Sequence, residues 1–158
     1  MAGNRTQKSR GFTLAEMLVA LALMALLMVA ATAAIDAAHQ SYVYNSEKTD
    51  MVTRVRGVLD RLTQDVRRAQ SVDVPDGRTV VVTFGSEETH TYEWDGRNGG
   101  EITFTVEGAT TRTATLCRYV KTFEASYAEP TCVVHLVLEG EQAGAEATVS
   151  ATPRKTFF

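Results

Sequence analysis

Apolar residues follow three successive patterns along this chain, and each pattern is typical of a different structural element. From Phe12 to Ile35 nearly every position is apolar. From Met51 to Ala69 the apolar residues recur every three or four positions, as on one face of a helix. This stripe consists of Met51, Val55, Val58, Leu59, Leu62, Val66 and Ala69. Beyond residue 71 apolar and polar residues alternate, which is typical of half-buried β-strands.

The first two patterns predict one long helix. No proline occurs before Pro75, so nothing in the backbone forces a break between Phe12 and about Gln70. The apolar run is long enough to cross a bilayer as a helix, which takes ~20 residues. The segment from Tyr42 to Thr49 is polar and weakly patterned, which leaves a local break open there.

The third pattern predicts a sheet. Strand-like runs occupy Val80–Phe84, His90–Trp94, Ile102–Val106 and the stretches at about 113–127, 132–139 and 146–152. Turn signals rich in Gly, Pro, Asn and Asp separate these runs. No long helical pattern interrupts them, so we expect antiparallel hairpins. The predicted fold class is α+β: a long N-terminal helix whose second half packs on a small antiparallel β domain.

One carboxylate, Glu16, lies inside the apolar run. An ionisable group within a membrane segment costs roughly 3 kcal/mol, so it needs a functional reason and a partner. The preceding residues include Arg5, Lys8 and Arg10 and no acid. Basic residues before a hydrophobic span favour a cytoplasmic N-terminus, so the rest of the chain should lie across the membrane.

The charge balance bears on possible partners. The formal net charge is −3, although the basic leader holds three of the 16 basic residues and none of the 19 acidic ones. The remainder of the chain is therefore more acidic than the total indicates. Nucleic-acid binding needs a basic face, so we expect no nucleic-acid partner.

The junction Gly11-Phe12-Thr13-Leu14, with Glu16 at the fifth position after the glycine, resembles the processing site of type IV prepilins and pseudopilins. The resemblance implies that a membrane prepilin peptidase cuts after Gly11 and methylates the new amine of Phe12. It also implies that Glu16 meets the N-terminal amine of a neighbouring subunit during assembly. The implied organisation is a prepilin leader (1–11), a hydrophobic transmembrane and assembly helix (12–35), its amphipathic continuation (36–70) and a periplasmic β domain (71–158).

The end of the helix, Arg61 to Ala69, followed by an all-β region, resembles the J-type minor pseudopilins of type II secretion and the PilW-type minor pilins. The segments Tyr119–Glu124, Val133–Leu138 and Thr152–Arg154 are similar to the same group. The resemblance implies a minor subunit that joins or primes a type II secretion pseudopilus or a type IV pilus. Its implied partners are other pilins, the prepilin peptidase and, before assembly, the bacterial inner membrane, which it spans once with its C-terminal domain in the periplasm.

Other interpretations of the N-terminus stay open at this stage. An ordinary signal peptide would have an apolar region of about 7–15 residues and a cleavage site of small residues after it, and here that site would fall near Ala34. A single-pass anchor could instead carry a periplasmic binding module that never polymerises. Glu16 could also simply extend to the cytoplasmic interface.

Cys117 and Cys132 are the only cysteines. An even number of cysteines in an oxidising compartment suggests a disulfide, and the two residues lie in neighbouring strand-like runs. The alternative is two buried free thiols, because Cys132 shares a face with Val134, Leu136 and Leu138.

No other residues form a pattern typical of catalysis or of metal binding. His39, His90 and His135 have no second ligand at metal-binding spacing. Asp73, Asp76 and Asp95 lie in predicted turns, but they form no calcium-binding series. A nucleophile elbow and a phosphate-binding glycine loop are both absent. We therefore expect no enzyme activity, no cofactor and no metal.

Overall fold

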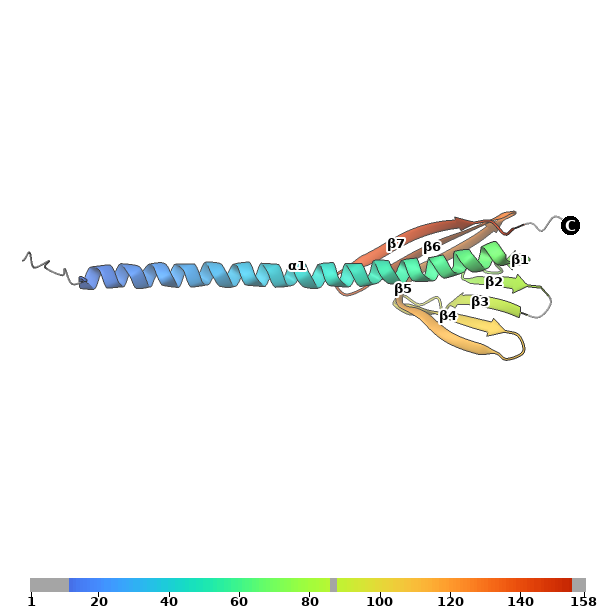
Figure 1. Cartoon of the computed structure of the whole chain (residues 1–158), viewed down its shortest axis with the longest axis horizontal. Coiled ribbons are helices and arrows are strands. Elements are labelled where there is room, and N and C mark those ends of the chain that lie inside the picture. Colours follow the sequence, from blue (N-terminus) through green and yellow to red (C-terminus); the bar gives the residue numbers. More distant parts are fainter. Residues whose placement is uncertain (1–11, 86–87, 155–158) are drawn as a thin grey trace, which may run out of the picture. The chain divides into compact units, whose positions relative to one another are not determined.

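A computed structural model describes residues 12–85 and 88–154. Within these residues it contains one helix and seven strands (Figure 1). They are α1 (Leu14–Arg68), β1 (Ser71–Asp73), β2 (Thr79–Phe84), β3 (Glu88–Trp94), β4 (Gly100–Glu107), β5 (Arg112–Ala128), β6 (Thr131–Glu139) and β7 (Gly144–Ala151). The structure therefore confirms the predicted α+β fold.

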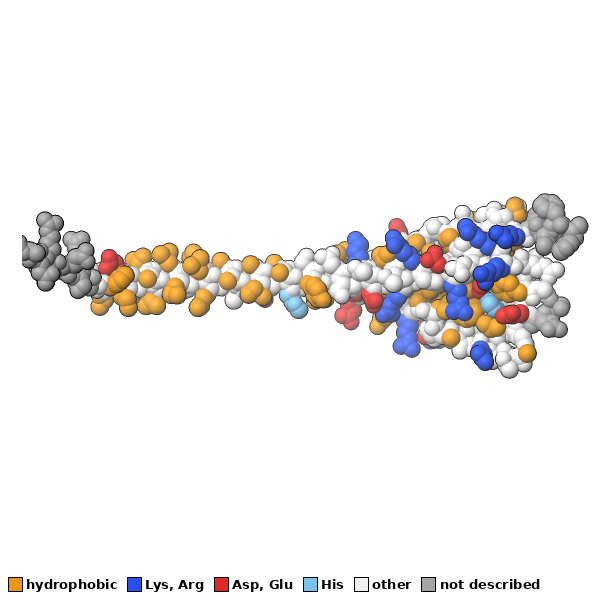
Figure 2. Space-filling model, in the orientation of Figure 1, with side chains coloured by type: hydrophobic (Ala, Val, Ile, Leu, Met, Phe, Trp, Pro, Cys, Tyr) orange, Lys and Arg blue, Asp and Glu red, His pale blue; other side chains and the backbone are white. Residues whose placement is uncertain are grey.

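The chain divides into two compact units between Tyr42 and Val43. Helix α1 nevertheless remains helical from Tyr42 to Thr49, so the local break that the sequence left open does not occur. In the first unit every described residue is exposed, and hydrophobic side chains cover the visible face of this part of α1 (Figure 2). A helix that is apolar all round needs lipid or other helices around it. This segment of α1 is the one described helix long and apolar enough to cross a membrane.

The seven strands form a single antiparallel sheet in which each strand pairs with the next in sequence. Strand β1 is the one that the sequence pattern did not predict. It begins directly after α1, where the amide of Gln70 donates to the carbonyl of Thr83 and Ser71 pairs with Thr83. At three residues it is too short to show an alternating pattern.

Strand β5 belongs to both halves of the sheet. Its first part pairs with β4 and its second part with β6, and Val120 takes part in both ladders. The register shifts on both sides of this point, and Tyr119 has a positive φ of 65°. These irregularities bend the sheet, as bulges do. Strands β2 to β4 and strands β6 and β7 consequently lie on opposite sides of the second half of α1 in the view of Figure 1.

The core forms between the second half of α1 and the face of the sheet that it covers. All seven stripe residues predicted from the helical period are buried, with Val66 fully inaccessible. They pack with inward side chains of the strands, including Tyr92, Ile102, Phe123 and Leu136. Full burial of a side chain such as leucine contributes about 1.5–3 kcal/mol. The stripe therefore supplies much of the free energy that holds helix and sheet together.

Leu62 lies at the centre of this stripe and is 1% exposed. We expect Leu62→Ala to lower the free energy of unfolding by about 2–5 kcal/mol, because it removes buried methyl groups and leaves a cavity. The measurement is urea unfolding of the full chain in detergent micelles, followed by the near-ultraviolet signal of Trp94. The matched control is Gln64→Ala on the exposed side of the same helix, where a change of at most ~0.5 kcal/mol is expected. Equal losses in the two variants would contradict the proposed packing.

Candidate functional site

The predicted processing and assembly residues lie at the start of α1. Gly11 and the rest of the leader lie outside the described residues. Phe12 is 82% exposed, and the helix begins two residues later at Leu14. Glu16 therefore occupies the third helical position, within the first turn.

Thr13 and Glu16 form a reciprocal hydrogen-bonded pair that closes the helix start. The backbone amide of Thr13 donates to Glu16 Oε2 at 2.8 Å, and the Thr13 hydroxyl donates to the same oxygen at 3.1 Å. In return the amide of Glu16 donates to Thr13 Oγ1 at 3.3 Å. This is the geometry of a capping box, which satisfies amide groups that a helix start otherwise leaves without partners.

The charge of Glu16 alone does not predict this capping box. Its signal, a threonine followed three residues later by a glutamate, is present in Thr13-Leu14-Ala15-Glu16. In the structure the same carboxylate also defines where α1 begins.

The capping box leaves Glu16 with unused hydrogen-bonding capacity. Both contacts go to Oε2, and no described residue donates to Oε1. The positive end of the helix dipole also favours a negative charge at this position. No other residue between Leu14 and Ile35 is ionisable. A cation that pairs with Oε1 must therefore be supplied by a group outside this segment.

The surroundings of Glu16 suit a helical neighbour. A shallow apolar groove runs beside Glu16. It is lined by Phe12, Ala15, Glu16, Val19, Ala20 and Leu23. Two of these lining residues are alanines, and small residues allow the backbones of two membrane helices to approach closely. The geometry therefore combines an apolar contact surface with one unsatisfied carboxylate oxygen.

The disulfide that the sequence left open does not form. Both Cys117 and Cys132 are free and buried. The register places Cys132 opposite Tyr127, whereas Cys117 lies in the other part of β5, opposite Ile102. Roughly 10 residues at ~3.3 Å each separate these two positions along β5. A disulfide requires Cα atoms within ~7 Å, so the alternative of two buried thiols is correct.

A second polar cluster, also missed from the sequence, joins α1 to β3. Asp65 Oδ2 accepts a hydrogen bond from the hydroxyl of Tyr92 at 2.6 Å and lies 2.7 Å from Nδ1 of His90. The other ring nitrogen of His90 is 3.0 Å from Glu88 Oε1. Burial, and then the neighbouring Asp65, raise the pKa of Tyr92 well above its usual range. The cluster keeps Tyr92 protonated as a donor and fixes α1 against the sheet.

Asp76, one of the turn carboxylates, has a structural role. The carboxylate of Asp76 accepts the amide of Arg78 at 2.9 Å and the hydroxyl of Thr79 at 3.3 Å, which closes the turn before β2. The backbone hydrogen bond lowers the pKa of Asp76. Within residues 12–85 and 88–154, no three His, Cys, Asp or Glu side chains are grouped so that they could hold a metal ion.

Residues 6–32 match the family model described as the prokaryotic N-terminal methylation motif. The match covers the junction, Thr13, Glu16 and the first part of α1. It supports the resemblance of this N-terminal segment to that of type IV pilin-like proteins. No match to this chain was found among curated proteins or among solved structures.

The cysteine geometry leads to a chemical prediction. Burial raises the pKa of Cys117 to about 11 and also raises the pKa of Cys132, so both thiols stay protonated in the folded chain at pH 8. We expect almost no alkylation of the folded protein at that pH and two adducts by mass spectrometry after unfolding without reductant. Reductant should leave the free energy of unfolding unchanged.

The raised pKa of Cys117 predicts that the free energy of unfolding depends on pH. A raised pKa in the folded state means that the folded chain holds the proton more tightly, so stability falls as the pH rises. For Cys117 the loss begins near the ordinary value of 9.0 and is complete above about 11. Cys117→Ala should reduce this loss in pH-dependent urea unfolding. An identical pH dependence in both proteins would contradict the assignment.

Proposed function

We propose that this chain is a minor pilin or pseudopilin subunit that is cut after Gly11, methylated at Phe12 and assembled into a filament. The observation that carries the proposal is the start of α1. There, the N-terminal methylation motif coincides with the apolar first part of α1, from Leu14 to Ile35. The one carboxylate of this segment caps the helix through Oε2 and leaves Oε1 without a described partner. A methylated amine at Phe12 of a neighbouring subunit is a cation of the right kind for this oxygen.

The physical argument concerns desolvation. A carboxylate and an amine in lipid each carry a large desolvation penalty, and pairing them offsets part of that cost. The exposed apolar side chains of α1 from Leu14 to Ile35 then bury against neighbouring helices. The pairing would bring subunits into register because Glu16 is the one ionisable side chain of this segment.

The finer assignment is to a minor subunit of the J type of type II secretion or of the PilW type. A seven-stranded meander directly after the helix supports it, as do the helix-end residues Arg61 to Ala69. Before assembly the subunit would span the inner membrane once, with the β domain in the periplasm. As a minor component it would prime the filament or occupy part of its tip.

A membrane-anchored binding module that never polymerises is the competing function. It accounts for the apolar helix and the β domain but gives no role to the methylation motif. Such a module would retain residues 1–11 in the mature protein, so processing separates the two functions.

We expect the mature chain to begin at methylated Phe12. Gly11→Val should block cleavage, because a branched side chain would crowd the peptidase site, whereas Arg10→Lys in the leader should be processed normally. N-terminal sequencing and intact mass of the protein from its native membrane test this expectation. A mature chain that begins at Met1, or that is cut near Ala34, would refute the proposed function.

Two substitutions at Glu16 separate its two physical roles. Glu16→Gln removes the charge but can keep the capping box, in which glutamine also serves, whereas Glu16→Ala removes both. If the charge pairs with an amine, both variants should lose about 10-fold or more in filament incorporation, as the ~1.5–3 kcal/mol of a charge-assisted hydrogen bond implies. Incorporation is measured by immunoblotting of sheared filaments at matched protein levels.

The matched control is Glu141→Gln in the exposed turn between β6 and β7, which should incorporate normally. Membrane insertion and processing are checked in all variants. Normal incorporation of Glu16→Gln alone would show that helix capping, and not charge, is the role of Glu16.

A further inference from the structure

The two edges of the sheet differ in how they are protected. Strand β1 forms one edge with only three residues, and Pro75 follows soon after it. A short edge strand and a nearby proline both discourage pairing with another chain. Strand β7 forms the other edge with eight residues and pairs with β6 without any register shift. It contains no proline, lysine or bulge.

The backbone groups of β7 that face outward can be identified from the ladder. The amide of Gly140 donates to the carbonyl of Ala143 at the hairpin turn, and the alternation of antiparallel pairs then carries along both strands. A second observation gives the same alternation. The amide of Ala125 in β5 donates to the carbonyl of Gly77 and so points away from β6. Its partner Val134 therefore directs its backbone groups toward β7, where it lies opposite Val149. Both observations indicate that the backbone amides and carbonyls of Ala145, Ala147 and Val149 face β6. The amides and carbonyls of Glu146, Thr148 and Ser150 therefore face the free edge, and no described residue hydrogen-bonds to them.

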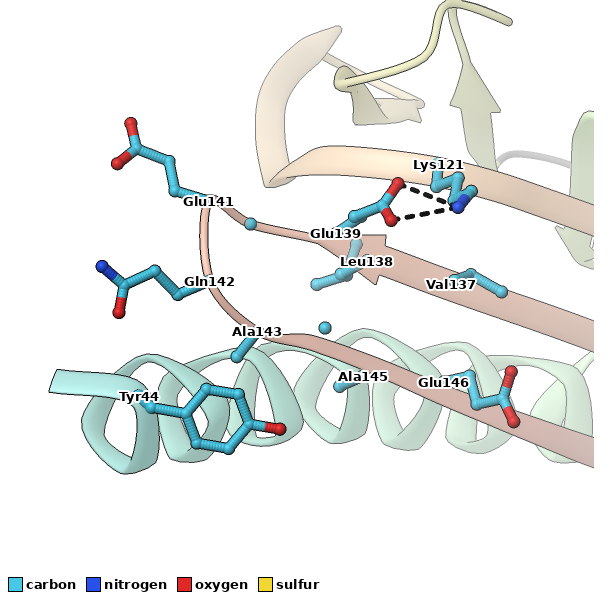
Figure 3. A pocket seen from close by; sticks show the side chains of 12 residues that line it. Tyr44, Lys121, Val137, Leu138, Glu139, Glu141, Gln142, Ala143, Ala145 and Glu146 are labelled. Carbon is cyan, nitrogen blue, oxygen red and sulfur yellow. Dashed lines mark hydrogen bonds and ion pairs between the residues drawn. The ribbon is translucent and has the colours of Figure 1, made fainter. Parts of the chain in front are cut away.

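The side chains of β7 complete the description of this edge. Ala145, Ala147 and Val149 lie on the core side but are only half-buried. The side chains of Glu146, Thr148 and Ser150 are exposed, and Glu146 makes no ion pair with a described residue. Figure 3 shows the start of the strand, where Glu139 of β6 pairs with Lys121 and Tyr44 of α1 lies beside the hairpin turn. The edge thus presents a row of free backbone groups, a row of small apolar side chains and one free acid.

We propose that the β7 edge binds an extended segment of a different protein, which adds an eighth strand to the sheet. The free amides and carbonyls recognise main chain, and alternate side chains of the bound segment supply specificity. The complementary segment has larger apolar residues over Ala145, Ala147 and Val149 and a basic residue beside Glu146. The inference rests on the proposed function, in which this segment belongs to a neighbouring subunit of the filament.

A second copy of this chain is a poor occupant. Two β7 strands would place small apolar residues against small apolar residues and would add a second acid to the same edge. Pairing of β7 with β1 of another copy would offer only the three residues of β1. The edge therefore favours a partner with a different sequence.

Thr148→Pro tests the edge with little cost to the fold. The amide of Thr148 faces outward, so proline removes no hydrogen bond to β6, but it removes a donor and places a ring where the added strand would lie. The matched control is Thr148→Val, which keeps the amide and the branched shape. In cells that produce the filament, we expect incorporation of Thr148→Pro to fall by about 10-fold or more relative to Thr148→Val, since main-chain bonds provide the affinity in strand addition.

Amide hydrogen exchange of the wild-type chain provides a second measurement that does not depend on the variant folding. In isolated subunits in micelles, Ala145, Ala147 and Val149 should be protected while Glu146, Thr148 and Ser150 exchange fast. In sheared filaments all six should be protected. Unchanged fast exchange in the filament, or equal incorporation of the two variants, would overturn the proposal.

A photo-crosslinking residue at position 150 identifies the occupant by mass. An adduct with another subunit of the filament supports the proposal, and an adduct between two copies of this chain overturns it. Failure of the proposed function gives a different result. In that case the wild-type chain is absent from the filament, whether or not the β7 edge binds a strand.

Discussion

The mutual burial of one helical stripe and one sheet face determines most of this structure. The stripe from Met51 to Ala69 would be exposed to water on a lone helix, and the inward side chains of the strands would be exposed on a lone sheet. Because a single helix has to cover seven strands, the sheet must curve around it. The bend in β5 near Tyr119 and Val120 provides that curvature. A long strand shared by both halves keeps the sheet continuous through the bend.

Polar contacts then fix the alignment that apolar packing leaves loose. Asp65 holds Tyr92 and His90 at one position of the helix. Nearer the start of the packed segment, the carboxylate of Glu47 accepts the amide of Gln142 in the β6–β7 turn. At the other end the amide of Arg154 donates to the carbonyl of Arg67. The Asp65 bonds are partly buried, so they are costly to leave unmade, whereas the contacts of Glu47 and Arg154 lie nearer the surface and add directional detail. Together these contacts permit one register of α1 on the sheet.

The segment from Leu14 to Ile35 follows a different rule, because its exposed apolar surface suits lipid or other helices and not water. Nearly every side chain of this segment is apolar, so no stripe selects a direction of packing. Between Leu14 and Ile35 Glu16 is the one ionisable residue. Thr13 donates to its Oε2, and no described residue donates to Oε1. A single polar contact in an apolar segment has high value as a positional marker, since any shift along the helix would leave it without a partner. Such an arrangement, one carboxylate in an apolar segment, suits a helix that exchanges contacts with lipid for contacts with other helices.

The sequence by itself determined the elements whose residues repeat at a fixed period. The helical stripe, all its buried members and six of the seven strands could be predicted, because side-chain burial follows the periods of 3.6 and two residues. The Gly11–Phe12 junction and Glu16 could also be identified, since they are a local pattern. Only the tertiary structure decided the state of the cysteines and the partners of Asp65. Both depend on which residues of different elements lie opposite each other, and that register is set by the bend in β5 and by the packing of α1, neither of which is encoded in a local window of sequence.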